Sequence, residues 1–176
     1  MPTPILRTER LQLRPLAPRD AEPLYAIMSD DETMRFWDWP AFRDYATVAE
    51  IVAGQISDMV EGRSAYWAVS LLSDSTVFGA CDLSEIDPRQ GRAELGFLFN
   101  RGWWGNGYAV EAMDAVVDYA FESLGLERLW ARLHAGNEGS RRLLERLGFA
   151  YEGTLAGHVV RDGFRRDCLI YGRLKG

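Results

Sequence analysis

One segment constrains the fold most, because it predicts a strand, a glycine-containing turn and a helix in direct succession. The run Arg92–Phe99 is strand-like, and a helix with one apolar stripe begins near Ala109. Gly105 and Gly107 lie between them, and without a Cβ the backbone there can bend sharply and approach a ligand closely. The first N–H groups of a helix lack intrahelical partners, and the helix dipole is positive there. The turn is therefore predicted to bind an anion, and a pyrophosphate-bearing cofactor is the first hypothesis.

Two rival phosphate-binding motifs do not fit this turn. A dinucleotide fingerprint, Gly-x-Gly-x-x-Gly, needs Gly or Ala three residues after Gly107, where the chain has Val110. That fingerprint also requires an acidic residue at the end of the following strand, whereas Glu127 precedes the next strand-like run, 128–135. A Walker loop needs Gly-Lys followed by Ser or Thr, and the sequence has no such tripeptide. The turn therefore does not indicate a nicotinamide-binding oxidoreductase or a P-loop enzyme.

Length and composition indicate one globular domain over residues 1–176. The net charge of −6 argues against nucleic-acid binding, which needs a basic face, and is compatible with cationic substrates such as amines. No apolar run approaches the ~20 residues of a membrane span, and the start Met-Pro-Thr-Pro lacks a signal pattern, so we expect a cytoplasmic protein without membrane contact. Cys81 and Cys168 are far apart in the sequence, so we expect both to be reduced and no metal site.

The patterning elsewhere predicts strands alternating with helices, which indicates a mixed sheet in an α/β or α+β layer fold. A Thr-x-x-Glu capping box at Thr47 and Glu50 is predicted to open a helix with an apolar face that includes Val48, Val52 and Val60. The remaining helices are expected from Pro18 to about Met28, from Ala109 to Gly125, and from Asn137 to before Gly148; the strands are expected at 11–14, 65–71, 76–83, 93–99 and 129–134, followed by a hairpin around Asp162-Gly163.

The glycine turn reads Trp104-Gly105-Asn106-Gly107-Tyr108-Ala109, and this resembles the acetyl-CoA loop of the GCN5-related N-acetyltransferases (GNAT). The form Trp-Gly-x-Gly-Tyr-Ala-x-Glu-Ala is similar to the branch named for the ribosomal-protein acetyltransferases RimJ and RimL. Trp104 replaces the first Gln or Arg of the general pattern, as that branch often does. Further parts of the pattern follow in order, namely Asn137-Glu-Gly-Ser140, Leu147-Gly148-Phe149 and Asp162-Gly163 with Asp167, Tyr171 and Leu174.

The resemblance implies a single-domain GNAT fold, with a mostly antiparallel mixed sheet of about seven strands and four helices. The fourth and fifth strands, here Ala93–Phe99 and Leu129–His134, would splay into a V that holds acetyl-CoA. The pyrophosphate would lie on the turn, and Asn137 would cap its helix and touch the pantetheine amide. The residues expected to bind the cofactor are Phe97, Leu98, Phe99, Trp104, Gly105, Asn106, Gly107, Tyr108, Ala109, Asn137 and Ser140.

Glu94 is the first candidate for the general base, because it interrupts an otherwise apolar strand where a carboxylate is costly unless it is paired or working. Partial burial would raise its pKa toward the range that suits a base. Two other roles stay open: a structural salt bridge to Arg92 or Arg132, and a grip on the acceptor's ammonium without proton transfer. Asp82 and Glu85, one strand earlier, are reserve candidates.

Ser140 is the candidate for protonation of the leaving sulfur. Many members of the resembled family use a Tyr for this purpose, and Leu144 stands at the matching position. A serine hydroxyl near a helix N-terminus can donate to a forming thiolate, although Ser140 could also simply support the cap made by Asn137. The donor to the oxyanion would be a backbone N–H, that of Leu98 or its neighbour.

The segment Phe36-Trp37-Asp38-Trp39 lies where the resembled family builds its acceptor pocket. Three aromatic rings and an acid could bind a cation through ring faces and charge, so we expect these four residues and Glu94 to contact the acceptor. The alternative is a loop that packs its rings on the core. His134 and His158 have no neighbours of metal-ligand type in the sequence and are expected to be structural.

The resemblance therefore implies an acetyl-CoA-dependent N-acetyltransferase whose acceptor is a primary amine, either a protein or peptide N-terminus or a small molecule. Direct attack of the neutral amine on the thioester is the family mechanism, and no metal takes part. The alternative is a catalytically silent acyl-CoA-binding or sensing module, which would keep the glycine turn and lose proton-handling groups such as Glu94 and Ser140. A monomer and a homodimer are both compatible with the sequence.

Overall fold

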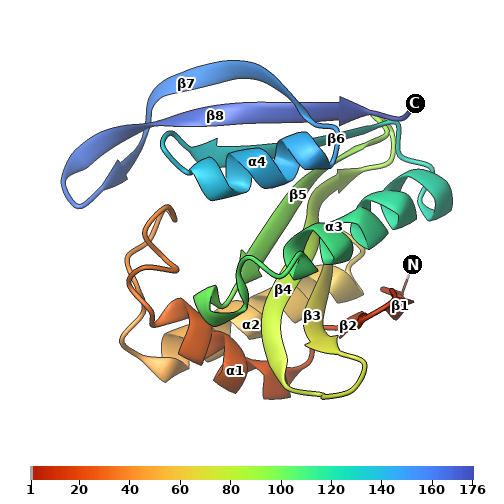
Figure 1. Cartoon of the computed structure of the whole chain (residues 1–176), viewed down its shortest axis with the longest axis horizontal. Helices are drawn as coiled ribbons and strands as arrows, with labels where there is room; N and C mark the ends of the chain where they lie inside the picture. Colours follow the sequence, from red (N-terminus) through yellow and green to blue (C-terminus); the bar gives the residue numbers. More distant parts are fainter. Residues whose placement is uncertain (1) are drawn as a thin grey trace.

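The computed structural model describes residues 2–176 as one eight-stranded sheet with helices on both faces (Figure 1). The strand order is β1-β2-β3-β4-β5-β6-β8-β7, and every pairing is antiparallel except that of β5 with β6. The elements are β1 (Leu6–Arg7), β2 (Leu11–Pro15), α1 (Ala21–Met28), α2 (Tyr45–Val60), β3 (Ala65–Leu71), β4 (Val77–Asp87), β5 (Arg92–Phe99), α3 (Tyr108–Asp118), β6 (Arg128–His134), α4 (Glu138–Arg146), β7 (Ala150–Arg161) and β8 (Phe164–Leu174).

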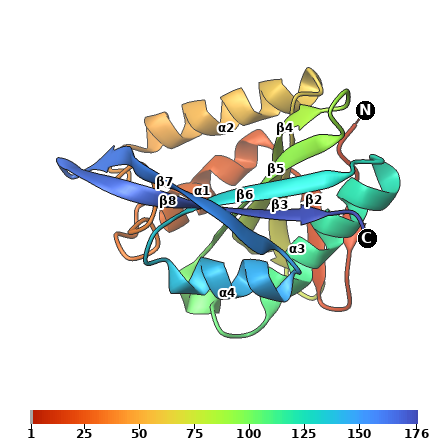
Figure 2. The same ribbon diagram turned by 90° about the horizontal axis from the view of Figure 1, so that it is seen from above.

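The sheet is the middle layer of three. Helices α1 and α2 cover one face, and α3 and α4 cover the other (Figure 2). Because successive side chains of a strand point to opposite faces, β5 contributes to both cores. Ala93 and Leu95 pack in the core under α3, whereas Leu98 packs in the core under α1 and α2. Glu94 alternates with Ala93 and Leu95, so its side chain lies on the α1–α2 face.

The sheet opens into a V between β5 and β6, as the fold expectation requires. These two strands pair only through Arg92 with Arg128, Ala93 with Leu129, and Glu94 with Trp130. Beyond Glu94 the edge of β5 has no strand partner, while β6 continues paired with β8. The expected mixed, mostly antiparallel sheet with four helices is confirmed. The count of about seven strands was one short, because the two-residue strand β1 carries no alternation that a sequence pattern could reveal.

Two predictions about α2 were wrong. The helix begins at Tyr45, and its N-cap is Asp44, whose carboxylate accepts from the amides of Ala46 and Thr47. Asp is as good a cap as Thr, and it comes earlier, so Thr47 lies inside the helix and opens no capping box. Val60, expected on the apolar face, is 83% exposed at the end of the helix.

The helix after the glycine turn is not uniformly α-helical. After α3 ends at Asp118, the segment Tyr119–Ser123 forms a π-helical turn, and the amide of Leu124 donates to the carbonyl of Tyr119 at 3.1 Å. Gly125 follows with φ +66°, which agrees with the predicted helix stop there. Within residues 2–176, no helix has both the length and the apolar composition needed to cross a membrane.

Candidate active site

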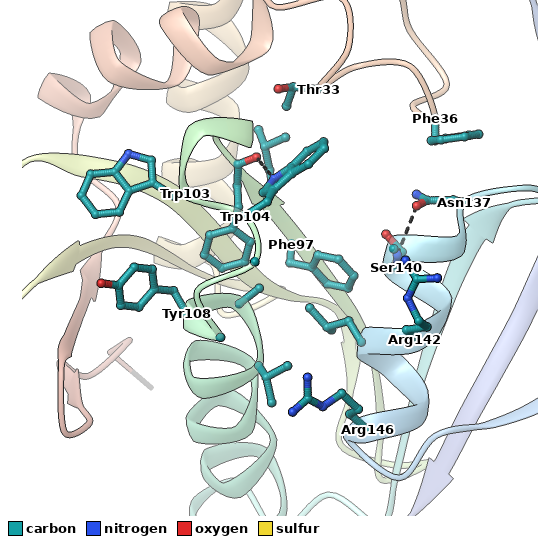
Figure 3. Close-up of a pocket in the computed structure, with 18 of the residues that line it drawn as sticks. Thr33, Phe36, Phe97, Trp103, Trp104, Tyr108, Asn137, Ser140, Arg142 and Arg146 are labelled. Carbon is teal, nitrogen blue, oxygen red and sulfur yellow. Dashed lines mark hydrogen bonds between the residues drawn. The ribbon is translucent and has the colours of Figure 1, made fainter.

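A cavity of about 600 Å³ fills the mouth of the V, between the glycine turn, the free end of β5 and α4 (Figure 3). Most of the residues expected to bind the cofactor line it. The loop between α1 and α2 supplies further walls. The expected residues that line this cavity are Phe36, Trp37, Phe97, Leu98, Phe99, Trp104, Gly105, Gly107, Tyr108, Ala109, Asn137 and Ser140; Asn106, Glu94, Asp38 and Trp39 are outside its lining.

The glycine turn has the backbone geometry that the sequence predicts. Gly105 and Gly107 both have φ +79°, in the left-handed region that strongly favours glycine, and Gly107 is the N-cap of α3. The first helical bond runs from the Glu111 amide to the Gly107 carbonyl at 3.1 Å. None of the backbone N–H groups from 105 to 109 donates a hydrogen bond within residues 2–176. The turn therefore presents a set of free N–H donors at the positive end of an 11-residue helix.

Arg10 braces this turn from the N-terminal strands, a contact that the sequence analysis did not find. Its side chain donates to the Glu111 carboxylate (Nε to Oε2, 2.6 Å) and to the Asn106 carbonyl (3.2 Å), and its guanidinium lies 4.4 Å from the centre of the Tyr108 ring. Asn106 points its own side-chain amide at the carbonyl of Trp104 (3.2 Å). Asn106 therefore shapes the turn from within and is not part of the cavity wall.

The free edge of β5 presents the backbone of Phe97 and Phe99 to the V. In an antiparallel ladder, alternate residues exchange hydrogen bonds with the partner strand. The Asn100 amide donates to the Phe78 carbonyl of the neighbouring strand at 2.9 Å, and in the same register Leu98 faces Ala80, so the N–H of Leu98 points toward β4. Of the two oxyanion donors left open by the sequence, the neighbour of Leu98 is thus the one on the cleft side. The Trp104 indole N–H already donates to the Phe99 carbonyl at 2.8 Å.

Helix α4 supplies the opposite wall of the cavity. Asn137 caps it as expected, because its side-chain oxygen accepts from the Ser140 amide at 3.1 Å. Ser140 itself lines the cavity, and so do Arg142 and Arg146; Arg146 projects from α4 toward α3, and Arg142 points toward Ser140 (Figure 3). Neither of these two arginines forms an ion pair within the described chain, whereas Arg141 is paired with Glu138 and Glu145. Their i, i+4 spacing, which places them on one helix face, was a usable sequence signal that the analysis missed.

Glu94 lies at the apex of the V, because it is the last residue of β5 that faces β6. Neither salt bridge considered for it forms: Arg132 is paired with Asp38, and no ion pair of residues 2–176 involves Arg92. The side chain is partly buried, and burial, reinforced by nearby carboxylates, raises the pKa of Glu94 to about 7. An unpaired carboxyl that titrates near neutral pH has the property a general base needs.

A second acid, Asp82, lies one strand away on the same face of the sheet. It is the register partner of Gly96, and a Cβ on Gly96 would collide with the Asp82 carboxylate, so a larger residue there would displace this side chain. Burial raises the pKa of Asp82 to about 6. Asp82 also lines a small adjoining cavity of about 60 Å³, which shares Trp37, Phe97 and Leu98 with the large one. Glu85, the other reserve candidate, is exposed on the same strand.

The residues of the aromatic loop differ in their surroundings. Phe36 and Trp37 line the large cavity, as an acceptor site would require, whereas the Trp39 side chain is 58% exposed. The Asp38 carboxylate is bound by Arg132 (Nη2 to Oδ2, 2.8 Å) and by His134 (Nε2 to Oδ1, 2.7 Å). Asp38 is therefore engaged with the protein itself, and its expected contact with a cationic acceptor stays a prediction.

The described residues contain no group of three or more His, Cys, Asp or Glu side chains placed to hold a metal ion. Cys81 and Cys168 are both free thiols in the interior. The chemical groups of the site are carboxyl groups, the hydroxyls of Thr33, Tyr108 and Ser140, backbone N–H groups and two arginines without ion pairs.

The chain is similar to known proteins in sequence and in fold. The family described as "Acetyltransferase (GNAT) domain" matches residues 10–150. An "Uncharacterized N-acetyltransferase p20" of Bacillus licheniformis is 33% identical over 171 residues, which cover 97% of this chain and 96% of the relative. Spermidine N(1)-acetyltransferase of Escherichia coli (strain K12) is 25% identical over 159 residues, covering 90% and 83%. A solved structure of RimL, the ribosomal L7/L12 alpha-N-protein acetyltransferase in complex with coenzyme A, has a TM-score of 0.87 at 18% identity and covers 97% of this chain and 98% of its own, a likeness of fold.

Proposed function

The chain belongs to the acetyltransferase (GNAT) family, and on that premise we propose that it transfers the acetyl group of acetyl-CoA to a primary amine. Family membership makes the protein an acyltransferase; the cosubstrate, the acceptor class and the roles of single residues are the proposal. One observation carries it: the free amides of the glycine turn open onto a cavity of about 600 Å³ that reaches the unpaired edge of β5. A diphosphate and an extended amide-containing arm need these two features side by side.

The wall of the cavity has groups that would bind the different parts of acetyl-CoA. The amides from Gly105 to Ala109 would hold the pyrophosphate, with the positive end of α3 behind them. Arg142 and Arg146, which lack protein partners, would bind the remaining phosphate charge. The backbone carbonyl of Phe97 would accept a hydrogen bond from the pantetheine arm, as in an added strand.

The proposed chemistry assigns one task to each remaining group. Glu94 accepts the proton of the amine, through a water because its carboxyl lies outside the cavity lining. The N–H of Phe97, which lies on the cleft edge of β5 and nearer to Glu94 than Phe99 does along the strand, stabilises the charge that develops on the carbonyl oxygen. The Ser140 hydroxyl donates a hydrogen bond to the sulfur as the carbon–sulfur bond breaks. The amine nitrogen forms a bond to the carbonyl carbon, the carbon–sulfur bond breaks, and CoA leaves while the acetyl group stays on the acceptor.

Charge on the acceptor side favours an amine. Asp82 and Glu94 lie on the face of the sheet beneath α1 and α2, and the charge of Glu85 is near enough to raise the pKa of Glu94. Trp37 lines both cavities on this side. Two of the three known proteins named above differ in acceptor: the name of one gives a polyamine, and the name of the other a protein α-amine. An α-amine, with a pKa of about 7.7–8.0, is partly neutral at pH 7 and needs a weaker base than an alkylamine of pKa about 10.4. We include both classes in the proposal.

The test is thiol release from acetyl-CoA in the presence of a panel of peptides with free N-termini, polyamines and other primary amines. Turnover with at least one amine, saturable in both substrates, is the expected result. Calorimetric binding of acetyl-CoA without turnover on any amine would instead identify the silent acyl-CoA-binding module. Absence of both binding and turnover would remove the assignment of the glycine turn.

A further inference from the structure

The loop that carries Trp37 contains a carboxylate, that of Asp38, which binds two side chains of β6. Both carboxylate oxygens of Asp38 accept hydrogen bonds from Arg132, Oδ1 at 3.2 Å and Oδ2 at 2.8 Å. Oδ1 is also hydrogen-bonded to Nε2 of His134 at 2.7 Å. Nη1 of Arg132, which donates to Oδ1 of Asp38, also donates to the Cys168 sulfur at 3.4 Å. These bonds connect positions 94 and 96 residues apart in the sequence, so they fix the loop against β6 and do not arise from local structure.

Arg132 is also the cation placed to pair with Glu94. Glu94 faces Trp130 in the β5–β6 register, and Arg132 is the next residue of β6 on the same face, because Ala131 and Leu133 point into the opposite core. Glu94 nevertheless has no ion-pair partner within residues 2–176, while the guanidinium of Arg132 is directed to Asp38. The competition between two carboxylates for one guanidinium is thus decided in favour of Asp38.

We propose that Asp38 is a positioning residue that, by binding Arg132 when its loop lies against β6, keeps Arg132 away from Glu94 and leaves Glu94 free as the base. This inference rests on the proposed function for the role of Glu94, but the electrostatic coupling can be measured without any turnover. The residue next to Asp38, Trp37, lines both cavities. The residue that holds Arg132 and a residue that lines the acceptor wall are therefore adjacent in one loop.

The charges around Glu94 act in opposite directions. Burial raises its pKa most, Glu85 raises it further, Arg132 lowers it, and Asp82 and Asp38 raise it. Tyr66 on β3 also faces this group, and His134 reaches it only through Asp38. For Asp38 itself, burial raises the pKa, but the hydrogen bonds from Arg132 and His134 outweigh it and hold the pKa below its ordinary value. Asp38 therefore stays ionised at neutral pH and neutralises Arg132 there.

Removal of Asp38 should reverse this balance. In Asp38→Ala the guanidinium is released on the face that it shares with Glu94, and an opposite charge within hydrogen-bonding reach lowers a carboxyl pKa by about 1–3 units. We expect the pKa of Glu94 to fall by about one unit or more. In Arg132→Gln, which removes the cation and keeps Asp38, the pKa should rise above about 7. In Asp38→Ala/Arg132→Gln it should return toward the value of the parent protein.

The measurement is a carbon-13 NMR titration of glutamate side-chain carboxyls in the full chain, with the Glu94 signal assigned from its loss in Glu94→Gln. The double variant is the decisive sample. If Asp38 only holds the loop in place, Glu94 becomes equally solvated in the single and double variants, and its pKa falls equally in both. An equal fall in both, or no change in Asp38→Ala, overturns the proposal. Asp38→Asn, which removes the charge while retaining the shape, should give a fall of the same sign and serves if the alanine variant does not fold.

The same variants separate this inference from the proposed function. If the variants move the pKa of Glu94 as stated and also shift the acidic limb of the kcat/KM profile in the same direction, the coupling and the role of Glu94 as base are both supported. If the pKa moves and the limb does not, the coupling stands and the role of Glu94 as base fails. A limb that shifts without a change in the NMR pKa of Glu94 assigns the limb to another group and overturns the coupling.

Discussion

Replacing Glu94 by Gln should make the protein more stable at alkaline pH while it impairs catalysis. Glutamine keeps the shape of the side chain and removes the charge. The pKa of Glu94 is about 7 in the folded chain against 4.5 for an unperturbed carboxyl. Between these two values the folded state retains a proton that the unfolded state has released, so the stability of the parent protein falls as pH rises through this window. Below pH 4.5 the group is neutral in both states and this effect vanishes.

The size of the effect follows from the same pKa difference. Each pKa unit corresponds to about 1.4 kcal/mol, which gives at most about 3 kcal/mol above pH 7. Glu94 retains contact with solvent, and solvent screening reduces this to about 1–2 kcal/mol. Relative to the parent, Glu94→Gln should therefore gain about 1–2 kcal/mol in the free energy of unfolding between pH 5 and pH 8.

Urea unfolding of both proteins at pH 5, 6, 7 and 8 measures this, because all other titrating groups are shared and cancel in the difference between the two curves. Asp82→Asn is the matched control: it also removes a buried carboxyl, but its gain should be nearly complete near pH 6. In the same samples, loss of the base should lower kcat/KM by about 100-fold or more and abolish the limb near pH 7. A stability difference that does not change with pH would refute the argument that Glu94 is an uncompensated carboxyl. A retained limb in Glu94→Gln that disappears in Asp82→Asn would transfer the role of base to Asp82.

Three further predictions concern the cavity wall. Gly107→Val places a β-branched residue at φ +79°, so it should deform the turn and weaken acetyl-CoA binding, measured by calorimetry, at least about tenfold. Gly54→Ala, in open space on α2, is the control and should leave the affinity unchanged. Equal affinity in both variants would contradict the anion-binding turn. Ser140→Ala should lower kcat roughly tenfold with no change in the dissociation constant for CoA, and an unchanged kcat would restrict Ser140 to the cap of α4. Arg146→Gln should weaken CoA binding and make the affinity less dependent on ionic strength. Arg141→Gln is the control and should change neither, because Arg141 is already paired with two glutamates. The same loss of affinity in both variants would mean that only net charge matters.

The parts of this molecule that the sequence predicted correctly are those whose signals are local. Gly105 and Gly107 adopt left-handed backbone angles because the chain must reverse within a few residues before α3. Asn137 caps α4 because the amide it binds belongs to Ser140, three residues later. The strand β3 was predicted with its observed ends, since its apolar run is bounded by turn residues. In each case cause and effect lie within one turn or one strand.

Features that depend on contacts between distant segments were missed or assigned to another role. Asp38 was expected to face a substrate cation, and the sequence has no signal that Arg132 and His134, more than 90 residues later, would bind it. Likewise, Arg10 reaches Glu111 across 101 residues. The start of α2 was missed for a different reason, competition between two nearby caps, in which the earlier residue, Asp44, prevailed over Thr47.

The backbone of Leu98 shows most sharply why a motif can locate a site without assigning its donors. Side-chain alternation along β5 can be predicted from apolar spacing, but the edge toward which a given N–H points depends on the pairing register with β4. A slip of one residue would exchange the amides that face β4 with those that face the V. Here the bond from the Asn100 amide to Phe78 fixes that parity, directs the Leu98 amide to Ala80 and leaves the Phe97 amide on the cleft side. Any oxyanion donor from β5 must therefore come from an odd-numbered position, so a single hydrogen bond at the end of the strand decides which amide can act at its centre.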